Sequence, residues 1–198
     1  MNPEPDRGSL RRELRAARAA IPPHLRRLAE QRIVATLSTM SWFSAGGSLA
    51  LYVSIGHEVD TAGLMQLCHR RRCRIYLPRI VDHRLQRMVL CLDGGAPLRV
   101  NRLGIGEPPP GPVINPALLP VILLPLLGFD ARGNRLGTGA GYYDRLLAGL
   151  PRDRNARRTR LIGLAHDCQQ RRHIEAQPHD FPLDGVVTGS GLRWFTTE

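Results

Sequence analysis

Residues 121–144 have the sequence VILLPLLGFDARGNRLGTGAGYYD. The run Val121–Leu127 is continuously apolar, which is typical of a strand buried on both faces of a parallel sheet. Arg135 and three glycines, spaced two residues apart, follow a turn predicted at 130–134. A helix is expected next, from Tyr142 to Leu150. This order of strand, Gly-rich loop and helix is a unit of an α/β fold.

The rest of the chain also alternates between helical and strand patterns. Two helices are predicted within residues 9–40, separated at Pro22-Pro23. A further helix is predicted through residues 64–68, with Asp60 as its N-cap. Residues 93–118, rich in Gly and Pro, are predicted to form an ordered excursion. The remaining strands are expected at residues 48–53, 74–78, 88–92, 161–164 and 185–187.

Length and composition indicate an ordinary soluble protein. The chain has 198 residues, of which 42% are hydrophobic and 23% are charged. We therefore expect a single domain over residues 1–198, with a three-layer α/β/α architecture and a mostly parallel sheet. No apolar window suits a membrane span, and the N-terminus lacks the apolar segment of a secretory signal. The expectation is a cytoplasmic monomer with no membrane partner.

Lysine is absent, because all 28 Lys and Arg residues are arginines. This excludes Schiff-base chemistry through lysine, pyridoxal-phosphate catalysis and a Walker P-loop. Any bound phosphate must be held by arginine, backbone N–H groups or a metal ion. The net charge of +11 favours phosphate-bearing partners, because guanidinium groups bind phosphate through two hydrogen bonds. An arginine-rich surface without a ligand explains the charge equally well.

The same charge leaves an alternative interpretation open, that of an RNA-binding protein without enzymatic activity. Arginine-rich stretches at 69–74 and 152–160 fit it, although the second is also typical of a solvated loop. Aromatic residues make up only 5% of the chain, and no recognisable nucleic-acid module is present. Nucleic acid is therefore not the expected partner.

Cysteine and histidine give no metal-binding pattern. No CxxC pair occurs, and a cytosolic chain keeps isolated thiols reduced. His166-Asp167 and His179-Asp180 have no HxxxH or HExxH spacing, so both histidines are interpreted as surface or capping residues.

The Gly-rich loop carries the most informative chemistry. Glycines let backbone N–H groups approach an anion, and a helix N-terminus adds partial positive charge. The GxGxG pattern matches neither a Rossmann nor a Walker motif, and a tight turn that caps a helix explains it as well. Arg135 before the loop can close on phosphate oxygens, and Asp144 after it can hold a cation. These are the parts that phosphoryl transfer needs.

Several motifs, in the same order, resemble the 5-formyltetrahydrofolate cyclo-ligase family, also called methenyltetrahydrofolate synthetases. The most specific is RLGTGAGYYDR at 135–145, with Gly128-Phe-Asp before it. The others are SLRRELR at 9–15, YVSIGHEVDT at 52–61, RIYLP at 74–78, GIGEP at 104–108 and HDFPLD at 179–184. The resemblance implies the fold type shared with sugar-phosphate isomerases and acyl-CoA transferases (NagB/RpiA/CoA-transferase-like).

The resemblance implies an ATP- and magnesium-dependent ring closure in one-carbon metabolism. In the family's reaction ATP phosphorylates the formyl oxygen of 5-formyltetrahydrofolate, N10 attacks the activated carbon, and phosphate leaves. The products are 5,10-methenyltetrahydrofolate, ADP and phosphate. The implied protein is a ligase with ATP as co-substrate and Mg²⁺ as cofactor.

The resemblance also implies the residues that carry this reaction. Arg135 and Tyr142 are the implied catalytic residues, and Val53 and Glu58, with Tyr142, are implied to contact the folate. The implied ATP-binding residues are Arg7, Gly8, Ser9, Leu10, Arg11, Arg135, Leu136, Gly137, Thr138, Gly139, Ala140, Gly141, Tyr142 and Tyr143.

Asp144 and Asp184 match the family's magnesium ligands, and two carboxylates suffice for Mg²⁺ when phosphate oxygens and water complete its shell. Thr138 and Ala140 stand where some relatives carry basic residues. Arg135 and Mg²⁺ are therefore expected to neutralise more of the charge on the transferred phosphate.

Overall fold

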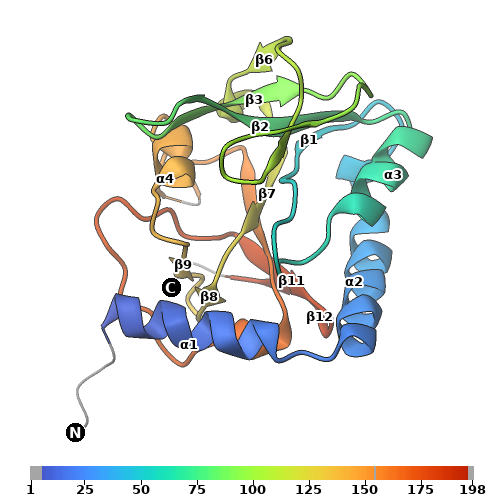
Figure 1. The fold of residues 1–198 in the computed structure, drawn as a ribbon. Helices are drawn as coiled ribbons and strands as arrows, with labels where there is room; N and C mark the ends of the chain where they lie inside the picture. The colour runs from blue at the N-terminus through green and yellow to red at the C-terminus, as the bar shows by residue number, and fades with distance from the viewer. Residues whose placement is uncertain (1–5, 154, 196–198) are drawn as a thin grey trace, which may run out of the picture.

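An eight-stranded sheet forms the centre of the computed structural model, which describes residues 6–153 and 155–195 (Figure 1). Its strands are β1 (Ser48–Ala50), β2 (Arg74–Asp82), β3 (Arg87–Leu92), β6 (Val113–Ile114), β7 (Val121–Pro125), β10 (Arg160–Leu164), β11 (Gly185–Thr188) and β12 (Gly191–Trp194). They lie in the order β12-β11-β10-β7-β1-β2-β3-β6. The five strands from β11 to β2 pair in parallel, and β12 and β3 add antiparallel partners at either side.

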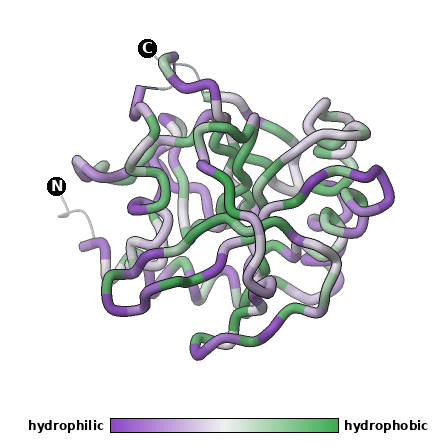
Figure 2. Tube along the Cα trace, turned by 90° about the horizontal axis from the view of Figure 1, so that it is seen from above, coloured by the Kyte–Doolittle hydropathy of each residue, from purple (hydrophilic) through white to green (hydrophobic). Residues whose placement is uncertain are grey.

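Helices cover both faces of this sheet, as the expected three-layer architecture requires. They are α1 (Arg7–Ala19), α2 (Pro23–Ser38), α3 (Ala62–Arg70) and α4 (Tyr142–Leu147), with short 3₁₀ turns η1 (Ser41–Phe43), η2 (Pro116–Leu118) and η3 (Asp167–Gln169). Leu37 of α2 and Leu64 of α3 are buried in the core cluster of one face, and Leu147 of α4 in that of the other. The hydrophobic residues follow the central strands in Figure 2, whereas hydrophilic residues gather in the outer segments.

The predicted break between the first two helices is confirmed. α2 begins at Pro23, where a proline is tolerated because the first helical N–H has no intrahelical acceptor. α1 is capped by Asp6, whose side chain accepts hydrogen bonds from the N–H groups of Gly8 and Ser9. Asp60 likewise accepts from the Ala62 N–H (2.9 Å), although α3 has Thr61 at its N-cap position.

Several strands differ from their predicted lengths, and β7 ends at Pro125 instead of Leu127. β2 does not stop at Pro78 but continues to Asp82. The N–H of Ile80 points away from β3 and donates to Glu107, so Pro78, two residues earlier, costs the β2–β3 ladder no hydrogen bond. β1 ends at Ala50, three residues before the predicted end. The antiparallel strand β12 was not predicted.

The strand order places a ligand crevice at the centre of the sheet. The chain goes from β1 to β2 on one side and later returns to β7 on the other side of β1. In open α/β sheets, ligands bind beyond the carboxyl ends of the strands at such a reversal. α1 crosses the molecule at this end, below β8 (Gly128–Phe129) and β9 (Arg135–Leu136) in Figure 1.

Candidate active site

Two cavities lie on either side of the Gly-rich loop. The larger, of about 540 Å³, lies at the carboxyl ends of β1, β2 and β7. The smaller, of about 120 Å³, lies between the loop, α1 and residues 177–180. Arg135, Gly137, Gly139, Gly141 and Asp144 line both cavities. A volume of roughly 300–1,000 Å³ is usual for a small-molecule pocket, so the larger cavity can hold a cofactor-sized substrate.

A short hairpin positions Arg135 at the start of the loop. β8 and β9 pair antiparallel, with Phe129 opposite Arg135. The predicted turn between them is confirmed: Asp130 Oδ1 accepts from the N–H groups of Arg132 and Asn134, both at 2.9 Å. Because the carboxylate of Asp130 is buried and fully bonded, it fixes the hairpin and with it the start of the loop.

The loop backbone needs glycine at two positions. Gly139 and Gly141 have φ angles of +103° and +72°, which side-chain-bearing residues rarely adopt. A Cβ atom on Gly139 would lie 3.4 Å from Cζ of Arg11. The Arg11 Nε donates to the Gly137 carbonyl at 3.0 Å, so α1 is fastened to the loop.

α4 follows the loop but is shorter than predicted, ending at Leu147 instead of Leu150. A helix of six residues has too small a dipole to form an anion site alone. Anion binding therefore depends on the loop N–H groups and the surrounding arginines.

Arg135 and Asp144 are brought together as an ion pair. The Arg135 side chain is 4% exposed, and its Nη2 donates to Oδ1 of Asp144. Its Nε donates to the Phe181 carbonyl at 3.3 Å. Asp144 remains 22% exposed to both cavities. A carboxylate in this position can accept a cation as well as the guanidinium.

The smaller cavity is lined by two arginines of α1. Arg7 and Arg11 line it, and Arg7 Nη1 lies 3.0 Å from Oδ2 of Asp180. Of the other residues implied for ATP, Gly8 and Ser9 donate their N–H groups to the Asp6 cap of α1, while Leu10 and Leu136 are buried in a small apolar cluster. Neither of these pairs lines either of the two cavities. Thr138, Ala140, Tyr142 and Tyr143 line the larger cavity.

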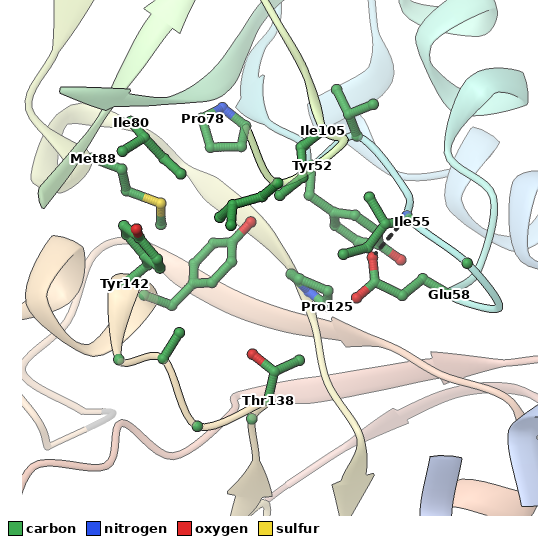
Figure 3. A pocket seen from close by; sticks show the side chains of 18 of the residues that line it. Tyr52, Ile55, Glu58, Pro78, Ile80, Met88, Ile105, Pro125, Thr138 and Tyr142 are labelled. Atoms are coloured by element: carbon green, nitrogen blue, oxygen red, sulfur yellow. Dashed lines mark hydrogen bonds between the residues drawn. The ribbon is translucent and has the colours of Figure 1, made fainter. Parts of the chain in front are cut away.

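Val53, Glu58 and Tyr142 all line the larger cavity, where Glu58 and Tyr142 lie on opposite sides (Figure 3). Glu58 Oε2 accepts from the Ile55 N–H at 3.1 Å, the bond drawn dashed in Figure 3. Burial raises the pKa of Glu58, and the Ile55 N–H and the Arg18 guanidinium oppose this rise. Glu58 thus presents a buried hydrogen-bond acceptor to a ligand.

The structure adds residues that were not predicted. Glu107, at the end of β5 (Gly106–Glu107), lines the larger cavity and is buried. Its Oε1 accepts from Asn101 Nδ2 (2.7 Å) and from the Ile80 N–H (2.9 Å), which joins β5 and its partner β4 (Arg99–Val100) to β2. Arg15 and Arg18 line the same cavity. Their spacing from Arg11, four and seven residues, is the one sequence signal for them.

Asp184 does not lie at the cavities that Asp144 lines. It directly precedes β11 and lines neither cavity, and its side chain is 2% exposed. Its Oδ2 accepts from the Leu161 N–H (2.7 Å) and Arg157 Nη2 (2.9 Å), and its Oδ1 from Arg160 Nη1 (3.2 Å). These contacts are at the amino ends of β10 and β11, whereas the larger cavity is at carboxyl ends. The implied magnesium role of Asp184 has no support in this placement.

The described residues of 152–160 are mostly exposed, as predicted for a solvated loop, but Arg157 is buried against Asp184.

We expect Asp184→Asn to lower the free energy of unfolding by about 3–5 kcal/mol, since it removes a carboxylate charge that pairs with the buried guanidinium of Arg157. Urea unfolding measures this loss. The activity of the folded fraction of Asp184→Asn should depend on magnesium concentration in the same way as the activity of the unaltered protein. A weaker magnesium response with unchanged stability would contradict this assignment.

The cysteines line neither cavity, whereas His179 lines the smaller one. Cys68, Cys73, Cys91 and Cys168 are free thiols, and burial raises the pKa of Cys68 to about 12. His179 is exposed and His166, although buried, is the N-cap residue of η3, so both fit the predicted surface or capping positions. Burial and two nearby guanidinium groups lower the pKa of His166 to about 4, so the imidazole is neutral.

Among residues 6–153 and 155–195, no group of three metal-binding side chains occurs. The same part of the chain contains no helix long and apolar enough to cross a membrane.

The chain is similar over most of its length to a known protein family. A sequence model described as the 5-formyltetrahydrofolate cyclo-ligase family matches residues 3–189. The 5-formyltetrahydrofolate cyclo-ligase of Escherichia coli K12 is 31% identical over 180 residues, which cover 89% of this chain and 97% of that one. The enzyme of Haemophilus influenzae is 30% identical, with 92% and 97% covered.

A solved structure supports the same relationship. The NMR structure of Aquifex aeolicus 5,10-methenyltetrahydrofolate synthetase superimposes with a TM-score of 0.80 at 28% identity and covers 97% of this chain and 94% of that one.

Proposed function

The chain belongs to the 5-formyltetrahydrofolate cyclo-ligase family, and from this premise we propose how its two cavities perform an ATP-dependent ring closure. It is an enzyme of the ligase class that converts 5-formyltetrahydrofolate to 5,10-methenyltetrahydrofolate, and not an RNA-binding protein. The observation that carries the proposal is the Gly-rich loop that both cavities share. The nucleotide phosphates occupy the smaller cavity and the folate the larger one.

On the nucleotide side, arginines replace the lysine that many phosphate sites use. Arg7 and Arg11 bind the phosphate oxygens, with the N–H groups of the loop glycines beside them. Arg11 also holds the loop, because its Nε donates to the Gly137 carbonyl. This bond fixes the position of the Arg11 side chain relative to the loop N–H groups. Such preorganised donors need no rearrangement as charge develops on the phosphoryl group.

On the folate side, Glu58 orients the substrate. Its free carboxylate oxygen accepts hydrogen bonds from the amino and ring N–H groups of the pterin. Tyr142, on the opposite side of the cavity and adjacent to the loop, contacts the formyl end. This orientation directs the formyl oxygen to the loop, where the γ-phosphoryl group arrives in line.

The chemistry then has two steps. The formyl oxygen attacks the γ-phosphorus, and the bond between that phosphorus and the ADP oxygen breaks. N10 next bonds to the formyl carbon, the carbon–oxygen bond breaks with its electron pair leaving on phosphate, and N10 loses its proton. Arg135, buried beside the loop, stabilises the charge on the transferred group in both steps.

Asp144 fits a magnesium ion that is shared with the nucleotide. It is a partly exposed carboxylate, it borders both cavities, and one of its oxygens has no hydrogen bond to the described residues. Mg²⁺ usually takes one or two carboxylates and keeps phosphate and water oxygens as its other ligands. When bound, it neutralises charge on the phosphates and orients them. Asp144 holds it, and Arg135 in turn positions Asp144.

Absorbance of the methenyl product tests the proposed function. The purified protein is mixed with 5-formyltetrahydrofolate and Mg²⁺, with and without ATP. The expected result is a rise in the methenyl band only with ATP, accompanied by an equal amount of released phosphate. A flat trace with ATP, or a rise that does not need ATP, would contradict the proposal.

A further inference from the structure

α1 carries four arginines on one face. Arg7, Arg11, Arg15 and Arg18 are spaced by four, four and three residues, which places them in one row along the helix. The first two line the smaller cavity, and the last two line the larger one. The row passes from the smaller cavity to the larger one at the Gly-rich loop. There Arg11 Nε donates to the Gly137 carbonyl (3.0 Å), and Arg15 Nη2 donates to the Thr138 carbonyl (3.3 Å).

Arg18 is a buried cation without an acceptor. The residue is 8% exposed, and its Nε is buried with no hydrogen-bond partner. Among the described residues, no carboxylate lies within 4.0 Å of its guanidinium and no carbonyl accepts from it. Burying an unpaired charge is costly, so a guanidinium in this state is completed by a group that the ligand brings.

The surroundings of Arg18 supply no anion in contact with it. Arg26, which faces it from α2, donates to the carbonyl oxygens of Arg18 and Ile21 and contacts His57. His166, from η3, is neutral because its pKa is lowered to about 4. Among the described residues, Glu58 is the one carboxylate whose charge raises the pKa of Arg18, and it does so from beyond ion-pair distance. The Arg18 side chain therefore points its charge toward the larger cavity.

We propose that Arg15 and Arg18 form an anion subsite on the folate side of the loop, which binds an oxyanion carried by the folate substrate. The inference rests on the proposed function. Two groups of that substrate have the required chemistry: the phosphoryl group on its formyl oxygen after transfer, and the carboxylates of its glutamyl group. Phosphoryl transfer moves negative charge from the smaller cavity into the larger one. Arg7 and Arg11 remain behind, so on the folate side Arg15 and Arg18 supply positive charge in addition to Arg135, which also pairs with Asp144.

The test compares Arg18→Gln and Arg15→Gln with Arg12→Gln, a control on an exposed α1 position outside both cavities. The dissociation constants of 5-formyltetrahydrofolate and of 5-formyltetrahydropteroate, which lacks the glutamyl group, are measured by titration calorimetry without ATP. Turnover is measured at saturating substrates with ATP. Unfolding midpoints are recorded for all variants, and Arg15→Gln keeps the test valid if Arg18→Gln does not fold.

If the subsite binds the phosphoryl group, Arg18→Gln lowers kcat about tenfold or more and leaves both dissociation constants unchanged. If it binds glutamyl carboxylates, the unaltered protein prefers the glutamyl-bearing folate and Arg18→Gln removes this preference, with kcat kept. The inference is overturned if a folded Arg18→Gln and Arg15→Gln match Arg12→Gln in all of these measurements. Failure of the proposed function looks different, because the unaltered protein itself would then show no ATP-dependent turnover.

Discussion

Asp144→Asn is expected to lower ATP-dependent formation of the methenyl product on the order of 100-fold. The change keeps the shape of the side chain but removes the charge that we propose holds Mg²⁺ against the phosphates. It also weakens the ion pair with buried Arg135, so two groups beside the transferred phosphoryl are affected together. Initial rates are measured by methenyl absorbance over a range of Mg²⁺ concentrations. The half-saturating Mg²⁺ concentration should rise.

Asp153→Asn is the matched control, because Asp153 is exposed and its hydrogen bond to the Asn155 N–H (2.9 Å) needs only an oxygen that asparagine retains. It should behave like the unaltered protein. If Asp144→Asn kept both its rate and its Mg²⁺ response, Asp144 would not be a magnesium ligand. Binding of 5-formyltetrahydrofolate without ATP should be preserved in both variants, since Glu58 is unchanged.

Arg135→Gln is expected to lower kcat by roughly 100- to 1,000-fold, the usual loss when a preorganised charge-stabilising donor is removed. Among the described residues, Arg135 is the one cation that borders both cavities, so in the proposed mechanism it faces the phosphoryl group before and after transfer. Substrate affinity should change much less than kcat, because the lost interaction is strongest where charge develops. Steady-state kinetics with ATP and folate varied separately give both values.

Arg135→Lys separates positioning from charge. Lysine keeps the positive charge but cannot bond both Asp144 and the Phe181 carbonyl in the fixed geometry of a guanidinium. It should fold well and recover only part of the rate. Arg87→Gln, on an exposed position of β3, is the control for loss of a surface arginine. A rate for Arg135→Gln close to that of Arg87→Gln would remove Arg135 from the mechanism.

Much of the fold was predictable because its strands are short and apolar and because turn-forming or helix-breaking residues separate its elements. The run at Val121–Leu127 predicted β7 at the centre of the sheet, and the Pro22-Pro23 break predicted where α1 gives way to α2. The extension of β2 past Pro78 was not predictable from local propensity. It depends on β1 ending early, which leaves the proline's side of β2 without a strand partner.

The site was partly predictable, because some of its residues belong to one local sequence motif. Loop residues such as Arg135 and Asp144 are close in sequence, so a local motif brings them together. Asp184 could not be assigned in this way, because its role depends on Arg157 and Arg160 approaching it from a segment that resembles a solvated loop. Arg18 was missed because an arginine on an amphipathic helix is usually solvated, whereas here it is buried beside α2 and at the larger cavity.

The central claim is that the formyl oxygen is phosphorylated at the loop between the two cavities. The most direct test uses 5-formyltetrahydrofolate labelled with a heavy oxygen isotope in its formyl group, converted by the protein with ATP and Mg²⁺. Mass spectrometry of the released phosphate should find the label there, one labelled oxygen for each methenyl product formed. Label found in water, with unlabelled phosphate, would show that ring closure and ATP cleavage are not joined through the formyl oxygen.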